Sequence, residues 1–138
     1  MRYPIGLTSN GRMRFISTFV HGLMDYPMSL VLFFSPELFG FADAGGMATM
    51  LPRVLGVVMA ATALMTRYEL GVMKVLPMST HLMLDLMAGV LLAVSPWLFG
   101  FADLSRATTA FVVLGLLEAG TSLMTRRTPA VRSIQATR

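Results

Sequence analysis

The sequence predicts an all-α membrane protein with four transmembrane helices, arranged as two tandem, parallel two-helix repeats. Composition is the first observation behind this fold class. Hydrophobic residues make up 55% of the 138 residues and charged residues only 13%, against roughly 25% charged in an average soluble domain. A soluble chain this short keeps much of its surface in water and could not bury so much apolar surface. The chain also has no Cys, which excludes disulfides and thiolate metal sites.

Four apolar stretches are the second observation, and they cover residues 15–34, 47–65, 75–94 and 107–124. Each has about 18–20 residues, and a helix of that length is roughly 27–30 Å long, enough to cross the hydrocarbon core of a bilayer. Pro52 and Arg53 interrupt the start of the second stretch. Pro is tolerated in the first turn of a helix and Arg can extend its charge to the interface, so we expect this span to form.

An internal duplication is the third observation. The segment from His21 to Asp43 aligns with the segment from His81 to Asp103, 60 residues further on. Each unit has two helices, so both units enter the membrane from the same side, and we expect parallel repeats related by a pseudo-two-fold axis along the membrane normal. We divide the chain into an N-terminal tail, a first repeat, a loop, a second repeat and a basic C-terminal tail: residues 1–14, 15–67, 68–74, 75–126 and 127–138.

The basic residues predict the orientation. Nine of them fall in the two tails and the middle loop, which lie on one side of the membrane: Arg2, Arg12, Arg14, Arg67, Lys74, Arg126, Arg127, Arg132 and Arg138. Only Arg53 and Arg106 are left for the other side. Loops rich in Lys and Arg stay on the cytoplasmic side, so we expect a protein of the inner membrane with both termini in the cytoplasm.

A short motif follows the first helix of each predicted repeat. The second copy reads Ser95-Pro96-Trp97 and continues to Gly100 and Phe101. The first copy reads Ser35-Pro36-Glu37 and continues to Gly40 and Phe41, so it departs from the second at Glu37. With this motif at these places, the chain resembles the SPW-repeat family of bacterial and archaeal integral membrane proteins. The resemblance implies two-helix membrane repeats and brings no catalytic residues with it.

We interpret the Ser-Pro motif as a structural turn on the outer side. Pro removes a backbone donor and disfavours helix at the residue before it, and Ser can bond the freed carbonyls. Gly40 and Gly100 permit a tight turn back into the membrane, and Trp97 suits the interfacial belt. The alternative is a recognition surface for an extracytoplasmic partner.

Ionisable residues inside the spans are the candidate site. His21 and Asp25 are four residues apart and share a helix face, and His81 and Asp85 do the same in the second repeat. Unpaired ionisable groups in lipid are costly, so we expect these groups to face the interior and to find partners there. Glu118 joins this possible polar cluster from the fourth helix, and its counterpart in the first repeat is Met59.

Three functions of the cluster remain open from sequence. In the first, the His and Asp side chains bond one another and lock the helices together. In the second, His21 and His81 are axial ligands of a haem, or one of them ligates a chlorophyll-type pigment. In the third, the carboxylates and imidazoles relay protons or bind a cation as part of an oligomer. We assign no dedicated metal site, and no nucleophile with an adjacent base is evident, so we assign no catalytic residue.

Small residues recur at equivalent places on the second and fourth helices. Gly56 and Ala60 match Gly115 and Ala119, and small residues four apart let helix backbones approach closely. We expect them to serve in helix packing. The repetition indicates that the second and fourth helices meet near the pseudo-axis, or that they face an equivalent surface on another subunit.

Short loops, the lack of a soluble domain and the lack of a catalytic constellation favour a non-enzymatic role. We expect a structural accessory or scaffold subunit of a membrane complex. A subunit that binds haem or pigment is the alternative, and a proton or cation pathway is the third possibility. The expected partners are the lipid bilayer and other membrane subunits or further copies of the chain. No nucleic-acid-binding motif is present.

Overall fold

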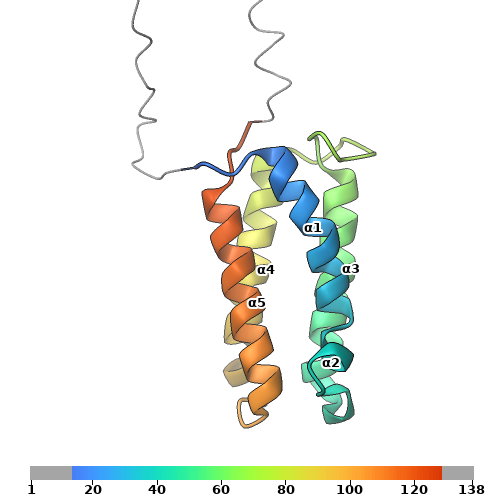
Figure 1. Cartoon of the computed structure of the whole chain (residues 1–138), viewed down its shortest axis with the longest axis vertical. Helices are drawn as coiled ribbons and strands as arrows, with labels where there is room; N and C mark the ends of the chain where they lie inside the picture. Colours follow the sequence, from blue (N-terminus) through green and yellow to red (C-terminus); the bar gives the residue numbers. More distant parts are fainter. Residues whose placement is uncertain (1–13, 129–138) are drawn as a thin grey trace, which may run out of the picture.

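A computed structural model describes residues 14–128 as a bundle of helices (Figure 1). The described residues form five α-helices, one 3-10 helix and no strand, which confirms the predicted all-α class. In chain order the elements are α1 (Thr18–Phe33), α2 (Ser35–Leu38), η1 (Ala42–Ala44), α3 (Gly46–Met65), α4 (Met78–Leu98) and α5 (Ser105–Met124).

Three of these helices, α3, α4 and α5, are long and apolar enough to cross a membrane. Helix α1 has only 16 residues, which is short for a span. The short helix α2 follows it directly, because the Phe34 amide donates to the Leu30 carbonyl at 3.0 Å and the Leu38 amide donates to the Phe34 carbonyl at 2.9 Å. The helical pattern of hydrogen bonds therefore continues past the break between α1 and α2.

The Ser-Pro motif lies inside the last helical turns and not after them. Pro36 has no N–H to offer to the Leu32 carbonyl, and the Ser35 hydroxyl donates to that carbonyl at 2.8 Å. This is the replacement that the sequence predicted. In the second copy the Ser95 hydroxyl donates one residue further back, to the Leu91 carbonyl at 2.5 Å, and α4 runs on without a break.

The chain turns back at the two motif glycines. Gly40 and Gly100 have φ angles of 69° and 72°, in the left-handed region that glycine adopts at little cost. In each copy the amide one residue later donates at 2.8 Å to a carbonyl five residues back, from Phe41 to Pro36 and from Phe101 to Pro96. This bond is typical of a glycine-terminated helix. Trp97 is exposed at this end of the bundle.

The small residues pack helices within each predicted repeat. A Cβ on Gly56 would lie 2.6 Å from the Ser29 carbonyl oxygen of α1, and a Cβ on Gly115 would lie 2.5 Å from the Gly89 carbonyl oxygen of α4. The close pairs are thus α1 with α3 and α4 with α5. The expectation that α3 and α5 meet at these glycines is wrong, because the atoms nearest to Gly56 belong to α1 and the atoms nearest to Gly115 belong to α4.

The apolar core fills the end of the bundle where the two motif turns lie. Phe111 of α5 is its centre, with its ring centroid 5.0 Å from that of Phe101 and 6.2 Å from that of Phe41. Leu32 of α1 and Leu92 of α4 are buried in the same cluster. Residues from both predicted repeats therefore share one core at this end.

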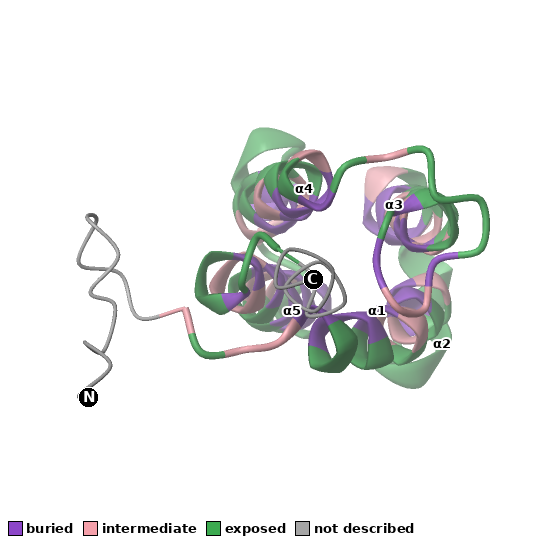
Figure 2. Cartoon of the chain, turned by 90° about the horizontal axis from the view of Figure 1, so that it is seen from above, coloured by how far each residue is buried: buried purple, intermediate pink, exposed green. Residues whose placement is uncertain are grey.

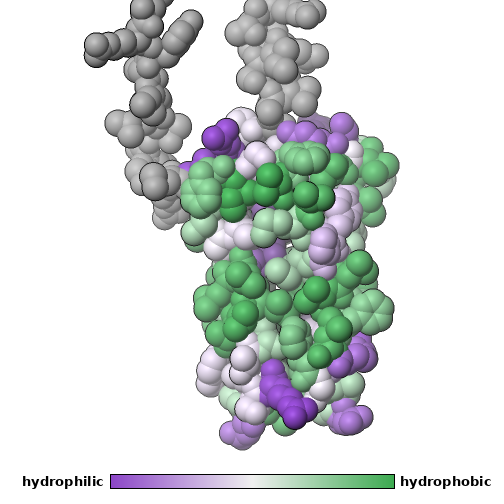
Figure 3. All heavy atoms as spheres, viewed as in Figure 1, coloured by the Kyte–Doolittle hydropathy of each residue, from purple (hydrophilic) through white to green (hydrophobic). Residues whose placement is uncertain are grey.

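Outside the core, the long helices present apolar side chains. Leu30, Val57, Met87 and Leu116 are more than half exposed. Figure 3 shows mainly hydrophobic residues over the length of the helices and hydrophilic residues at the two ends, and Figure 2 shows the buried faces turned toward the middle of the bundle. An apolar surface of this extent suits lipid and not water, so the chain is a membrane-type helical protein.

Both ends of the described chain leave the bundle at the same end. The Ile16 amide donates to the Met124 carbonyl at 3.1 Å, and the Arg126 amide donates to the Ile16 carbonyl at 2.9 Å. The loop between α3 and α4 also lies at this end (Figure 1). Arg53 is at the opposite end, where it pairs with Glu37. Four of the predicted cytoplasmic residues, Arg2, Arg12, Arg132 and Arg138, lie outside the described residues.

Candidate functional site

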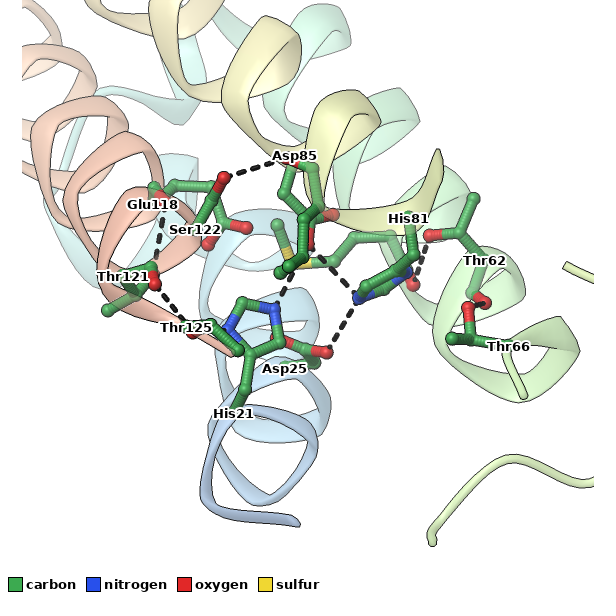
Figure 4. A network of polar contacts seen from close by, with 12 residues as sticks. His21, Asp25, Thr62, Thr66, His81, Asp85, Glu118, Thr121, Ser122 and Thr125 are labelled. Atoms are coloured by element: carbon green, nitrogen blue, oxygen red, sulfur yellow. Dashed lines mark hydrogen bonds and ion pairs between the residues drawn. The ribbon is translucent and has the colours of Figure 1, made fainter. Parts of the chain in front are cut away.

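Two histidines and two aspartates from α1 and α4 meet inside the bundle (Figure 4). We call His21, Asp25, His81 and Asp85 the His–Asp cluster. All four are buried, with no more than 3% of any of them exposed. The prediction that these groups face the interior is confirmed for the four, and they come from two helices that are far apart in sequence.

The contacts in the cluster cross between the two helices. His21 Nε2 lies 3.1 Å from Asp85 Oδ2, and His81 Nε2 lies 3.1 Å from Asp25 Oδ2. Each imidazole also approaches the carboxylate of its own helix, at 3.2 Å for His21 with Asp25 and 3.0 Å for His81 with Asp85. Each Nε2 atom therefore faces two carboxylates, one from each half of the chain.

Helix geometry places the four side chains. His21 is in the first turn of α1, where its amide donates to the Ser17 carbonyl at 3.0 Å, and His81 is in the first turn of α4, where its amide donates to the Pro77 carbonyl at 3.1 Å. The aspartates follow one turn later on the same faces. The cluster thus lies near the end of the bundle that holds the loop between α3 and α4.

Tyr68 of that loop covers the cluster. Its ring stacks on the His81 imidazole, with centroids 6.1 Å apart and planes 21° apart, and it is buried. A Cβ on Gly22 would lie 1.9 Å from the Tyr68 ring, so only glycine leaves room for this packing. Burial raises the pKa of the Tyr68 phenol above its usual value, so the cover is an uncharged ring.

Thr125 fixes the tautomer of His21. The Thr125 hydroxyl donates to the Thr121 carbonyl at 2.6 Å, which uses its only hydrogen. The same oxygen is 2.9 Å from His21 Nδ1, so it must accept a hydrogen bond from an Nδ1–H. The neutral form of His21 therefore presents an unprotonated Nε2 to the two carboxylates.

The second histidine has no such support. Thr66 is the counterpart of Thr125, and its hydroxyl likewise donates to the carbonyl four residues back, that of Thr62, at 2.6 Å. His81 Nδ1 is nonetheless buried without a hydrogen-bond partner. Sequence reasoning missed both threonines, although the duplicated Leu-Met-Thr-Arg segments were a signal that could have indicated them.

Glu118 is buried on α5 beside the cluster but does not join its contacts (Figure 4). Its Oε1 atom has no hydrogen-bond partner. The neighbouring Ser122 hydroxyl donates to the Leu82 carbonyl at 2.7 Å and so ties α5 to α4. Met59, the counterpart of Glu118, is part of the apolar core.

The arrangement does not fit a haem between the two histidines. The ring centroids are 5.5 Å apart, and the carboxylates of Asp25 and Asp85 occupy the space beside both Nε2 atoms that a porphyrin would need. A pigment bound to one histidine from the lipid side does not fit either, because both imidazoles are at most 1% exposed. The cluster in this arrangement therefore has no place for a haem or a pigment.

Two surface grooves of the described chain do not reach the cluster. One is lined by residues of α5 and by Phe39, and the other lies along α4 and α5 near Arg14 and Arg127. None of the four cluster residues lines either groove.

The four side chains could hold a metal ion, which the sequence analysis did not assign. One ligand atom from each residue can be chosen so that all lie within 4.8 Å of one another. Two imidazole nitrogens and two carboxylate oxygens form a donor set that first-row divalent metals accept.

Comparison with known proteins places residues 19–125 in one family. A model described as the SPW repeat domain matches that range, which confirms the resemblance seen in the motif. No curated protein and no solved structure matches the chain.

Proposed function

The chain belongs to the SPW repeat family, and we propose that it is a four-span inner-membrane protein with a structural, non-enzymatic role. It acts as an accessory or scaffold subunit that offers a rigid helical surface to other membrane proteins or to further copies of itself. Its two halves are tandem two-helix repeats, and both termini are cytoplasmic.

The crossed contacts of the His–Asp cluster carry this proposal. His21 bonds Asp85 and His81 bonds Asp25, so each bond joins one half of the chain to the other. Removing one partner of a buried ion pair leaves an uncompensated group and costs about 3–5 kcal/mol. The cluster therefore locks α1 against α4, and its imidazoles and carboxylates bond one another.

Equivalent elements support the four spans. Helices α1 and α2 together cover residues 18–38, and α4 covers residues 78–98, so they start and end at aligned positions. Five basic residues of the described chain lie in its ends or in the α3–α4 loop: Arg14, Arg67, Lys74, Arg126 and Arg127. The positive-inside rule puts that end in the cytoplasm.

Partner binding is supported by the outer faces of the helices. A Cβ on Gly120 of α5 would meet no atom within 4 Å, and Leu116 and Leu117 of the same helix are at least half exposed. Small residues on an exposed membrane helix allow another helix to approach. In the native membrane we expect this face to contact a partner helix.

A paired substitution tests the structural role. Asp25→Asn removes a charge from the cluster, whereas Asp43→Asn removes one from an exposed residue at the other end. We expect Asp25→Asn to lower the unfolding temperature in mild detergent by several degrees and Asp43→Asn to leave it unchanged. Equal unfolding temperatures for the two variants would show that the cluster does not lock the bundle.

The topology is testable because the chain has no native Cys. Single-cysteine variants at Ser9, Asp43 and Lys74 are labelled with a membrane-impermeant maleimide in spheroplasts. We expect labelling at position 43 only, with positions 9 and 74 labelled after the membrane is opened. Labelling of positions 9 and 43 together in intact spheroplasts would contradict the first span, and labelling of position 9 without position 43 would contradict the orientation.

The accessory role is tested with a photocrosslinking residue at position 120. In native membranes we expect one defined crosslinked product, and the same residue at Met87, an exposed position of α4, is the control for random lipid-facing collisions. No product at position 120, together with a monomer in native electrophoresis, would contradict a subunit role.

A further inference from the structure

We propose that the His–Asp cluster is a closed binding site for one divalent first-row metal ion of the Zn²⁺ type. The ligands are His21 Nε2, His81 Nε2 and one oxygen each of Asp25 and Asp85. Binding of a metal here does not depend on whether the chain is an accessory subunit.

The donor atoms lie close enough together for their side chains to converge on one ion. Zinc–ligand bonds of about 2.0–2.1 Å place neighbouring ligands roughly 3.3 Å apart in a tetrahedron. The four N–O contacts of the cluster are 3.0–3.2 Å long, with Asp25 using a different oxygen toward each histidine. One ligand atom from each residue can be chosen so that all lie within 4.8 Å of one another, so a four-ligand site requires the side chains to rearrange around the ion.

The tautomer of neutral His21 is the observation that favours a metal ion. Because His21 donates its Nδ1–H to Thr125, the neutral ring points the lone pair of Nε2 at two carboxylates. A lone pair and carboxylate oxygens about 3.1 Å apart repel one another unless a proton or a metal ion lies between them. A proton on Nε2 makes His21 an imidazolium, whereas a metal ion leaves the ring neutral. A ligating histidine that donates its other N–H to a fixed acceptor is the usual outer-shell arrangement of a protein metal site.

Charge gives the valence of the ion. Two neutral imidazoles and two carboxylates carry two negative charges, and within residues 14–128 these carboxylates form ion pairs only with His21 and His81. A divalent ion balances this charge inside an apolar bundle. Buried charges need such a balance because their desolvation is costly.

The donor set gives the class of the metal. Two nitrogens and two oxygens suit Zn²⁺, and also Co²⁺ as its spectroscopic substitute. Ca²⁺ and Mg²⁺ prefer six or more oxygen ligands, and Cu⁺ prefers sulfur. Four protein ligands leave no open coordination position, and Tyr68 covers His81. The metal therefore has a structural role and joins α1 to α4.

The test uses the full chain, purified in detergent without a polyhistidine tag. The chain has only two His and no Cys, so background binding is low. Metal content is measured first, and Zn²⁺ affinity is then measured against a chromogenic chelator. We expect about one Zn²⁺ per chain, and Co²⁺ should give the visible absorption of a tetrahedral site. A wild-type chain without stoichiometric metal and without tight Zn²⁺ binding would overturn the proposal, and would leave a cluster held by protons alone.

Variants locate the ion. His81→Gln removes a ligand and should weaken Zn²⁺ binding more than 100-fold, beyond the roughly 10–100-fold that an outer-shell partner contributes. Asp43→Asn is the exposed control and should bind as the wild type does. Equal affinity in His81→Gln and the wild type would overturn the site.

Two matched threonine variants keep the test decisive if His81→Gln does not fold. Thr125→Val removes the acceptor that orients His21, whereas Thr66→Val removes the equivalent hydroxyl, which makes no bond to His81. We expect about 10–100-fold weaker Zn²⁺ binding for Thr125→Val and little change for Thr66→Val. Equal effects would overturn the tautomer on which the site rests.

Discussion

Gly115 gives the sharpest test of how the helices pack. A methyl group at this position would lie 2.5 Å from the Gly89 carbonyl oxygen and 2.6 Å from the Ala93 nitrogen of α4. Ordinary van der Waals contact begins at 3.4 Å, so the methyl group is about 0.9 Å too close. Both obstacles are backbone atoms, and no side-chain rotation can relieve the contact. In Gly115→Ala, helices α4 and α5 must therefore move apart.

The expected loss can be set against a control on the same helix. Overpacking costs about 1–3 kcal/mol, whereas replacing Gly by Ala within a helix gains up to about 1 kcal/mol from propensity. Gly120→Ala gains helix propensity without any overpacking, because a Cβ at this position would meet no atom within 4 Å. The two variants should therefore differ in unfolding free energy by about 1–3 kcal/mol.

Thermal unfolding followed by circular dichroism in mild detergent measures this difference. At roughly 2–8 °C per kcal/mol for chains of this size range, Gly115→Ala should unfold several degrees below Gly120→Ala. Equal unfolding temperatures would refute the close approach of α4 and α5 at this glycine. A Gly120→Ala variant that is the less stable of the two would reverse the assignment of the buried face.

Three further substitutions test the turns and the cover of the cluster by the same measurement. Ser35→Ala removes the hydroxyl that donates to the Leu32 carbonyl and should cost about 1–3 kcal/mol; no loss would mean that this hydrogen bond does not contribute to stability. Gly100→Ala places a side chain at a φ of 72° and should cost about 1–2 kcal/mol, and a neutral result would argue against the left-handed turn. Gly22→Ala should displace Tyr68 from the cluster and lower the unfolding temperature, and an unchanged temperature would contradict the stacked cover.

The sequence indicated that the His and Asp side chains face the interior, and the reason is physical. Ionisable groups within apolar segments must find partners, and a duplicated His–Asp pair supplies them at equivalent depths. Which partner each group takes could not be predicted, because the crossed bonds of His21 and His81 depend on α1 and α4 being neighbours. The family motif was equally informative, since its Pro and Gly act through local backbone geometry.

Two features of the fold needed the structure. The glycines at positions 56 and 115 were interpreted as packing residues that join the second and fourth helices or face another subunit, whereas they pack against α1 and α4. A stripe of small residues does not say which helix approaches it. The roles of Tyr68 and Thr125 depend on where the α3–α4 loop and the end of α5 lie, and sequence spacing does not give that. Thr125 determines the tautomer of His21, and so the proposed metal site could not be derived before the fold.

One measurement tests the central claim, that the two halves are joined through their His–Asp pairs. The double variant Asp25→Asn, His81→Gln retains His21 and Asp85, which lie in different halves. It removes the ionisable group that each of them contacts on its own helix, Asp25 for His21 and His81 for Asp85. With ¹⁵N in the imidazole and ¹³C in the aspartate carboxyls, dipolar recoupling NMR in lipid bilayers reports their separation. The structure predicts strong dephasing from the contact of His21 Nε2 with Asp85 Oδ2 at 3.1 Å. No dephasing in a folded double variant would contradict the crossed contact and with it the lock between the halves.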